Sequence, residues 1–181
     1  RIIENGKLDE LMLISEAFHE KKISQIADMI CNATNKKKLV LISGPSSAGK
    51  TTFANRLFIQ LRVNGLKPVA ISIDDFFKDR GETPVGEDGE LDFETIDAID
   101  IKLFNDTMIR LIAGEEVEMP TFNFPKGEKD WTGKKLKIED DQIIIVEGIH
   151  GLNELMTQYI PKSQKFKIYI NALTHLSLDD H

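Results

Sequence analysis

The chain has 181 residues, a length that suits one domain with a substantial buried core. Its net charge of −7, from 23 basic and 30 acidic side chains, argues against direct nucleic-acid binding, which needs a clustered basic face. No apolar run approaches the roughly 18 residues of a membrane span, and the single cysteine cannot form an internal disulfide, so we expect a cytoplasmic protein.

The first predicted element is helical and covers residues 8–30. Apolar residues recur there at helical spacing, and a charged step at 20–22 leaves open whether this segment forms two helices or one bent helix. We assign residues 1–38 to a helical lead-in packed on the core, and residues 39–181 to the main domain.

A strand, a loop, a helix and a second strand come next. Residues 39–43 are a short apolar run typical of a strand buried on both faces, and residues 68–73 form a similar run. Between them, apolar residues spaced by four predict a helix over 52–64, and Gly65 is a good helix stop. This order is that of a βαβ unit.

The second half of the chain continues the alternation of strands and helices. We expect a loop over 79–94, an amphipathic helix over 95–113 and a β-hairpin arm over 117–138 that stands off the sheet. Strands at 143–146 and 166–170 flank a helix at 152–159. The prediction is an α/β fold with a doubly wound, mostly parallel sheet in a three-layer sandwich.

Residues 44–51 read Gly-Pro-Ser-Ser-Ala-Gly-Lys-Thr and match the P-loop pattern Gly-x-x-x-x-Gly-Lys-Thr at every fixed position. In such a loop, backbone N–H groups curl round a phosphate, and the following helix points its positive end at the anion. Lys50 supplies a mobile charge for the β- and γ-phosphates, and the Thr51 hydroxyl suits Mg²⁺. The pattern predicts nucleotide binding through Gly44, Ser46, Ser47, Ala48, Gly49, Lys50, Thr51 and Thr52.

Acidic residues follow two of the predicted strands. The chain carries no Asn-Lys-x-Asp guanine motif, which argues against a GTPase. Glu147 ends the third strand, where a carboxylate beside a P-loop can hold Mg²⁺ directly or through water. Asp74 ends the second strand, where a carboxylate can orient an acceptor hydroxyl and take its proton. Asp75 is a rival, although an extended segment would turn it to the other face.

Several motifs in a fixed order resemble the uridine kinase/phosphoribulokinase family. They are the loop itself, Ile-Asp-Asp-Phe-Phe at 73–77, Asp-Phe-Glu-Thr-Ile-Asp-Ala at 92–98, Pro-Thr-Phe-Asn-Phe at 120–124 and Val-Glu-Gly-Ile at 146–149. The resemblance covers residues 39–170 and implies a P-loop, nucleoside-kinase-like fold. Motifs at 79–80, 83–84 and 147–153 look closest to bacterial uridine kinase-like proteins that carry a threonyl-tRNA synthetase-type TGS region ahead of the kinase.

The resemblance implies a role for each matching residue. Asp74 matches the catalytic base, and Thr51 and Glu147 match magnesium ligands. In the resulting hypothesis Lys50 holds ATP, and Asp74 joins Thr51 and Glu147 in organising the metal. Glu94 matches an acid that binds the ribose hydroxyls.

The acceptor pocket departs from the family pattern. Phe122 and Phe77 stand where uridine kinases use tyrosines against the base and near the sugar, and Gly127 stands where they place a histidine for the base edge. Phenylalanine can stack on any base but cannot donate a hydrogen bond, which puts uridine specificity in doubt. Arg80 is a further candidate for substrate binding, as a partner for a phosphate or for a nearby acid. A lone His150 is read as structural.

The resulting hypothesis is an ATP- and Mg²⁺-dependent kinase that phosphorylates a small molecule, with the 5′-hydroxyl of a nucleoside as the favoured acceptor. A nucleoside monophosphate, a sugar phosphate or pantothenate is the alternative acceptor, and a non-catalytic ATP-binding regulatory module is the alternative class. The oligomeric state stays open, self-association included. The family's basic lid and a fifth strand have no counterpart before His181, so we expect a chain truncated ahead of them.

Overall fold

A computed structural model describes residues 8–33, 38–45 and 48–171 of the chain. Its centre is a four-stranded, wholly parallel sheet with the strand order β2-β7-β1-β8. The bounds of these strands are Leu39–Ser43 for β1, Lys67–Ser72 for β2, Gln142–Glu147 for β7 and Lys165–Tyr169 for β8. β1 and β7 take the two central places because their residues are apolar on both faces and are buried nearly throughout. The predicted parallel α/β sheet is confirmed.

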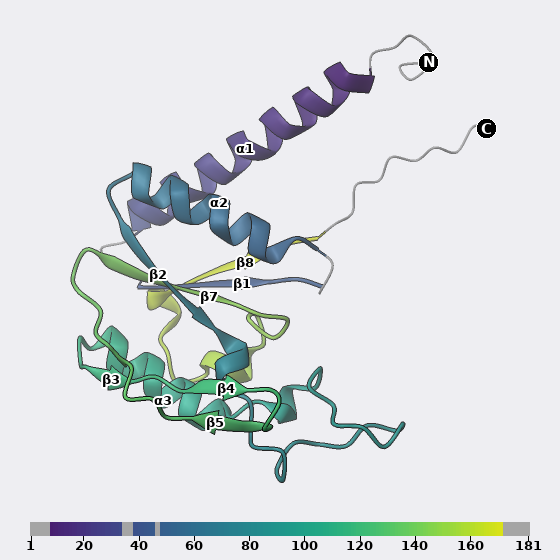
Figure 1. The fold of residues 1–181 in the computed structure, drawn as a ribbon. Helices are drawn as coiled ribbons and strands as arrows, with labels where there is room; N and C mark the ends of the chain where they lie inside the picture. The colour runs from purple at the N-terminus through teal and green to yellow at the C-terminus, as the bar shows by residue number, and fades with distance from the viewer. Residues whose placement is uncertain (1–7, 34–37, 46–47, 172–181) are drawn as a thin grey trace.

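Two helices, α1 (Leu8–Ala33) and α2 (Lys50–Val63), lie on one face of the sheet, as Figure 1 shows. The lead-in is a single helix, which settles the choice between two helices and one bent helix. Only its second half packs on the core, through Ile23, Ala27 and Ile30, which are completely buried. Its first half extends beyond α2 (Figure 1) and leaves Phe18 60% exposed.

Helix α3 (Ile101–Ile112) and the arm cover the opposite face and complete the three layers (Figure 1). The arm consists of two antiparallel pairs, in which β3 (Val117–Glu118) pairs with β6 (Lys135–Leu136) and β4 (Thr121–Asn123) with β5 (Glu128–Asp130). As expected, the arm stays outside the four-stranded sheet, since its strands pair only with each other within the described part of the chain. It does not project into solvent, however. Its apolar residues Val117, Met119 and Phe122 belong to the buried cluster beneath the sheet, because alternate positions of the arm are apolar and need cover.

Two predicted helices are shorter than expected. The segment 95–113 begins with a 3₁₀ turn, η2 (Ile96–Ala98), and becomes α-helical only at Ile101. Ile99 between them is extended and pairs with Phe77, and the Asp100 carboxylate then caps α3 by accepting from the Leu103 amide at 2.9 Å.

The segment 152–159 forms only the 3₁₀ turn η3 (Glu154–Thr157). The Asn153 side chain starts this turn by accepting from the Leu155 amide at 3.0 Å, and a further turn, η4 (Lys162–Gln164), leads into β8. None of the helices within the described ranges is long and apolar enough to cross a membrane.

Candidate functional site

The phosphate-binding loop joins the end of β1 to the start of α2, so it lies at the carboxyl edge of the sheet. The Ala48 amide donates to the Pro45 carbonyl at 3.0 Å, and Gly49 has a φ of 75°, a left-handed conformation that glycine adopts at low cost. The first helical hydrogen bond runs from the Phe53 amide to the Gly49 carbonyl. The amides of the residues between them therefore have no intrahelical partner and are available to an anion.

Four further residues of this loop were predicted to bind the nucleotide. Ser46 and Ser47 lie outside the described residues. The Lys50 ammonium group donates to the Pro45 carbonyl at 2.8 Å, so it lies over the loop itself. Gly44 is buried against the end of β8, where a Cβ would collide with the Ile170 carbonyl oxygen. This first glycine is required by a close approach of two backbones.

A hydroxyl and a carboxylate meet beside the loop. The Thr51 Oγ1 donates to Glu147 Oε1 at 3.1 Å, which joins the start of α2 to the end of β7. The second oxygen of the same carboxylate, Glu147 Oε2, is buried and has no hydrogen-bond partner among the described residues. A buried carboxylate oxygen without a partner is costly, and a divalent cation would satisfy it. These two residues therefore fit a magnesium ion.

The ion would receive few protein ligands here. Among the described residues, no group of three or more histidine, cysteine, aspartate and glutamate side chains converges on one point. Mg²⁺ commonly keeps several waters and takes one or two carboxylates together with substrate phosphates. The sparse donor set therefore suits a phosphate-bridging magnesium ion better than a closed structural metal site.

Asp74 follows β2 on a 3₁₀ turn, η1 (Ile73–Phe76), that the Ser72 hydroxyl caps by accepting from the Asp74 amide at 3.2 Å. Its side chain lines a pocket of about 330 Å³ together with Lys50, Thr51 and Glu147. Desolvation and the neighbouring Asp75 carboxylate raise the pKa of Asp74 above its ordinary value, and the positive charge of Lys50 opposes this shift.

Asp75 lies on the other side of the turn. Its Oδ1 accepts from the Phe122 amide of the arm at 3.3 Å, and it lines a separate hollow of about 280 Å³ between α2 and β2. The structure thus separates the two neighbouring carboxylates, with Asp74 in the pocket beside the P-loop lysine and Asp75 bonded to the arm.

The far wall of the 330 Å³ pocket contains two of the predicted substrate residues, Phe77 and Glu94. Phe122 does not line it. Its side chain is 6% exposed and packs edge-on against Phe77 and Phe93, with ring centroids 5.5 and 6.0 Å apart. Phe122 therefore supports the pocket wall from behind and does not present its own face to the pocket.

Arg80 also lies outside this pocket. Its amide donates to the Gly127 carbonyl at 2.6 Å, and its side chain crosses directly over Gly127, where a Cβ would lie 2.9 Å from the Arg80 Nε. The glycine therefore leaves room for the arginine. No side chain projects from position 127 toward an acceptor.

The lining residues that sequence reasoning missed include Phe93 and His150. His150 Nε2 lies 2.8 Å from the Glu94 carbonyl oxygen, so it joins the segment after β7 to the segment that carries Glu94. The sequence reading of His150 as structural agrees with this bond but overlooked its place in the pocket. The signal was its position three residues after Glu147, at a strand end that faces the site.

Comparison with known proteins identifies the family of this chain. The model of the Phosphoribulokinase / Uridine kinase family matches residues 39–180. The chain belongs to this family. Over 120 residues it is 28% identical to a uridine kinase of Leuconostoc citreum, a match that covers 65% of this chain and 56% of the relative. Over 139 residues it is 30% identical to a uridine kinase of Mycoplasma pneumoniae, covering 77% of this chain and 62% of the relative.

Solved structures of the same architecture support the fold. A possible uridine kinase from Bacillus stearothermophilus superposes with a TM-score of 0.59 at 19% identity, covering 79% of this chain and 78% of that one. A D-glycerate 3-kinase from Cryptococcus neoformans gives a TM-score of 0.50 at 16% identity, covering 71% and 52%. At these identities the likeness concerns the fold. The chain spans less than two thirds of the length of the two uridine kinases named above.

Proposed function

We propose that this chain is the core of an ATP-dependent kinase that transfers the γ-phosphate to a nucleoside, at its 5′-hydroxyl. One observation carries the proposal. A single pocket is lined by the P-loop lysine and threonine and by the acids that end two neighbouring strands, Asp74 and Glu147. Phosphoryl transfer depends mainly on positioning and on stabilisation of charge, and this arrangement supplies both.

The nucleotide side of the proposed site uses the residues of the P-loop. The amides of residues 49–52, with Ser46 and Ser47, would hold the phosphates of ATP. The Ala48 amide and the Lys50 ammonium group would both leave the Pro45 carbonyl, and Lys50 would move to the β- and γ-phosphates. Thr51 and Glu147, with Asp74 close by, would hold Mg²⁺, which neutralises phosphate charge when it is bound.

The acceptor side uses the opposite wall. The Asp74 carboxylate would orient the acceptor hydroxyl and receive its proton, a task that a raised pKa favours because it makes the carboxylate a better base. Glu94 would accept hydrogen bonds from the ribose hydroxyls, and the ring of Phe77 would lie against the nucleoside. Phe122 would act through Phe77.

The pocket favours an uncharged acceptor over a nucleoside monophosphate or a sugar phosphate. Among the described residues that line it, Lys50 is the only lysine or arginine, and the ATP phosphates would engage that charge. Arg80, the candidate for a substrate phosphate, lies on Gly127 outside the lining. A non-catalytic regulatory module would not need Asp74 and Glu147 together in one pocket.

The proposal also covers the order of the regions in the full-length protein. We infer that residues 39–181 form its kinase domain, that residues 1–38 lead into it, and that a TGS-type region precedes them. The motifs at 79–80, 83–84 and 147–153 support this subgroup. We also infer a cytoplasmic enzyme whose substrate is a small molecule. The negative net charge supports the absence of direct nucleic-acid or membrane-surface binding by this domain.

The test is ATP consumption by the full-length protein with a panel of nucleosides, nucleoside monophosphates, sugar phosphates and pantothenate. We expect turnover with a nucleoside, and we expect Asp74→Asn to lower kcat about 10²–10⁴-fold while ATP binding is kept. ATP binding without turnover for every acceptor would favour the regulatory module. Full activity of the variant would show that the base is misassigned.

A further inference from the structure

We propose that Lys129, on strand β5 of the arm, is a positioning residue that fixes the acceptor wall of the pocket. The inference rests on the proposed kinase function, since it concerns how the acceptor is held. Lys129 itself does not line the pocket. It acts through the backbone of Phe77, which does.

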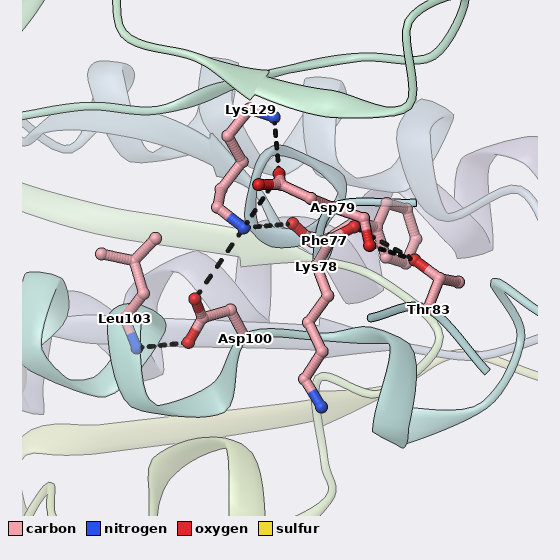
Figure 2. Close-up of polar contacts among 7 residues, drawn as sticks. All are labelled: Phe77, Lys78, Asp79, Thr83, Asp100, Leu103 and Lys129. Carbon is pink, nitrogen blue, oxygen red and sulfur yellow. Dashed lines mark hydrogen bonds and ion pairs between the residues drawn. The ribbon is translucent and has the colours of Figure 1, made fainter. Parts of the chain in front are cut away.

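The Lys129 side chain is a nearly buried cation surrounded by oxygen atoms, as Figure 2 shows. It is 10% exposed, and its Nζ donates to the Phe77 carbonyl at 2.9 Å. Two carboxylates complete its surroundings, Asp79 Oδ1 at 3.5 Å and Asp100 Oδ2 at 3.8 Å. A buried ammonium group needs such partners, so this geometry specifies the place of the arm closely.

The backbone of Lys129 adds a second point of attachment. Its amide donates to Asp79 Oδ1 at 2.9 Å, so one aspartate holds both the main chain and the ammonium group of the same residue. Two attachments to one carboxylate fix the direction of β5 as well as its distance. These contacts therefore fix the arm beside the segment that follows η1.

The segment that Lys129 holds forms part of the pocket. Residues 76–78 run beside residues 98–100, with the Lys78 amide donating to the Ala98 carbonyl and the Asp100 amide to the Phe76 carbonyl, both at 2.8 Å. Phe77 pairs with Ile99 across this contact, and both line the pocket. Lys129 therefore contacts Phe77, which is one of these two wall residues. It also pairs with Asp100, which directly follows Ile99, the second wall residue.

The surrounding turns have hydrogen bonds of their own that do not involve Lys129. Asp100 Oδ1 caps α3 through the Leu103 amide, and the Thr83 hydroxyl donates toward the carbonyls of Lys78 and Asp79 at 3.1 and 3.2 Å (Figure 2). Loss of the lysine should therefore spare the helix cap and this turn. Its effect should be concentrated at the Phe77 carbonyl and so at the acceptor wall.

The experiment compares Lys129→Met with Lys126→Met in the full-length protein. Lys126 is on the same arm but is 59% exposed, and among the described residues its ammonium group forms an ion pair only with Asp130, at 3.6 Å, which makes it a matched control. For Lys129→Met we expect the KM of the acceptor to rise about tenfold or more, because a misplaced wall weakens acceptor binding. The Kd of ATP should stay within about twofold, since the P-loop is untouched. Lys126→Met should change neither constant.

Lys129→Arg distinguishes positioning from simple packing. Arginine keeps the charge and the donors, so we expect it to recover most of the acceptor KM. An unchanged acceptor KM in Lys129→Met would overturn the proposal. So would a parallel loss of ATP affinity and stability, which would mark Lys129 as a general structural residue.

Hydrogen exchange keeps this test separate from the proposed activity. Amides of residues 76–80 and 128–130 should exchange faster in Lys129→Met, while those of α2 stay protected. If the native protein transfers phosphate to no acceptor, the kinase proposal fails, and the exchange result still judges the attachment of the arm. Unchanged exchange in these segments would contradict the role given to Lys129.

Discussion

At the scale of single residues, the Asp74 carboxylate lies between opposing influences. Desolvation raises its pKa most, the Asp75 charge raises it further, and Lys50 lowers it. A raised pKa in an acid means that the folded state binds the proton more tightly than the unfolded state. The contribution of this group to stability is thus greatest at low pH and is lost as pH rises through the folded pKa. At neutral pH the ionised Asp74 therefore lowers the stability of the folded state, and the same raised pKa makes the carboxylate a stronger base.

The pH dependence of activity should report this carboxylate. The acidic limb of the kcat/KM profile should have an apparent pKa above 3.8, the ordinary pKa of an aspartate, because Asp74 must be ionised to accept a proton. Asp75→Asn should shift that limb to lower pH, since it removes the neighbouring negative charge while the amide oxygen can still accept from Phe122. The measurement is a pH–rate profile of both proteins. A limb that stays in place or moves upward would show that Asp74 is not the titrating group.

At the scale of elements, the ends of β2 and β7 approach each other across a glycine. A Cβ on Gly148 would lie 2.6 Å from Cδ1 and 3.0 Å from Cβ of Ile73, which is itself 2% exposed. Ile73 precedes Asp74 and Gly148 follows Glu147. The absence of a side chain at this glycine therefore lets the two acidic residues share one pocket.

Gly148→Ala should separate these two strand ends. We expect a loss of about 1–3 kcal/mol in the free energy of unfolding, because the buried Ile73 cannot move away without disturbing the core. The kcat should fall as well, since Asp74 moves with Ile73. Gly81→Ala is the control, because a Cβ there meets no atom within 4 Å. Denaturant unfolding and steady-state kinetics on both variants test this, and equal behaviour would show that the site tolerates the displacement.

At the scale of the whole molecule, the lead-in helix divides into two unlike halves. The second half of α1 packs with α2 and the sheet in one buried cluster, and side chains near its middle reach α2, where Glu20 accepts from Gln60 at 2.8 Å. The first half extends past this contact and leaves apolar side chains exposed. The stability of the P-loop layer therefore depends on residues 23–30 far more than on residues 12–18.

Substitutions along α1 should separate these halves. Ile23→Ala should lower the free energy of unfolding by about 2–5 kcal/mol, since the side chain is completely buried. Phe18→Ser should change it by no more than about 0.5 kcal/mol, because that ring is 60% exposed. Urea unfolding of the two variants measures both values. A large loss for Phe18→Ser would mean that the first half is covered in solution.

Local sequence patterns predicted much of the fold. The predicted bounds of β1, β7 and α2 lie close to the observed ones. Each element is either continuously apolar or periodic in its buried residues, and turn residues flank it. The helix over 95–113 was overpredicted because Ile99 has helical spacing but pairs with Phe77, a partner distant in the sequence. Tertiary pairing overrides a local period of this kind.

The sequence alone determined the family, the glycine loop and the two acidic strand ends, because those depend on residue type and short spacing. Only the tertiary structure decided which neighbouring carboxylate enters the pocket, that Phe122 lies behind its wall, and that Lys129 holds Phe77 from the arm. These outcomes depend on how segments about 50 residues apart pack against each other. Contacts of that range leave no periodic signal in the sequence of either segment.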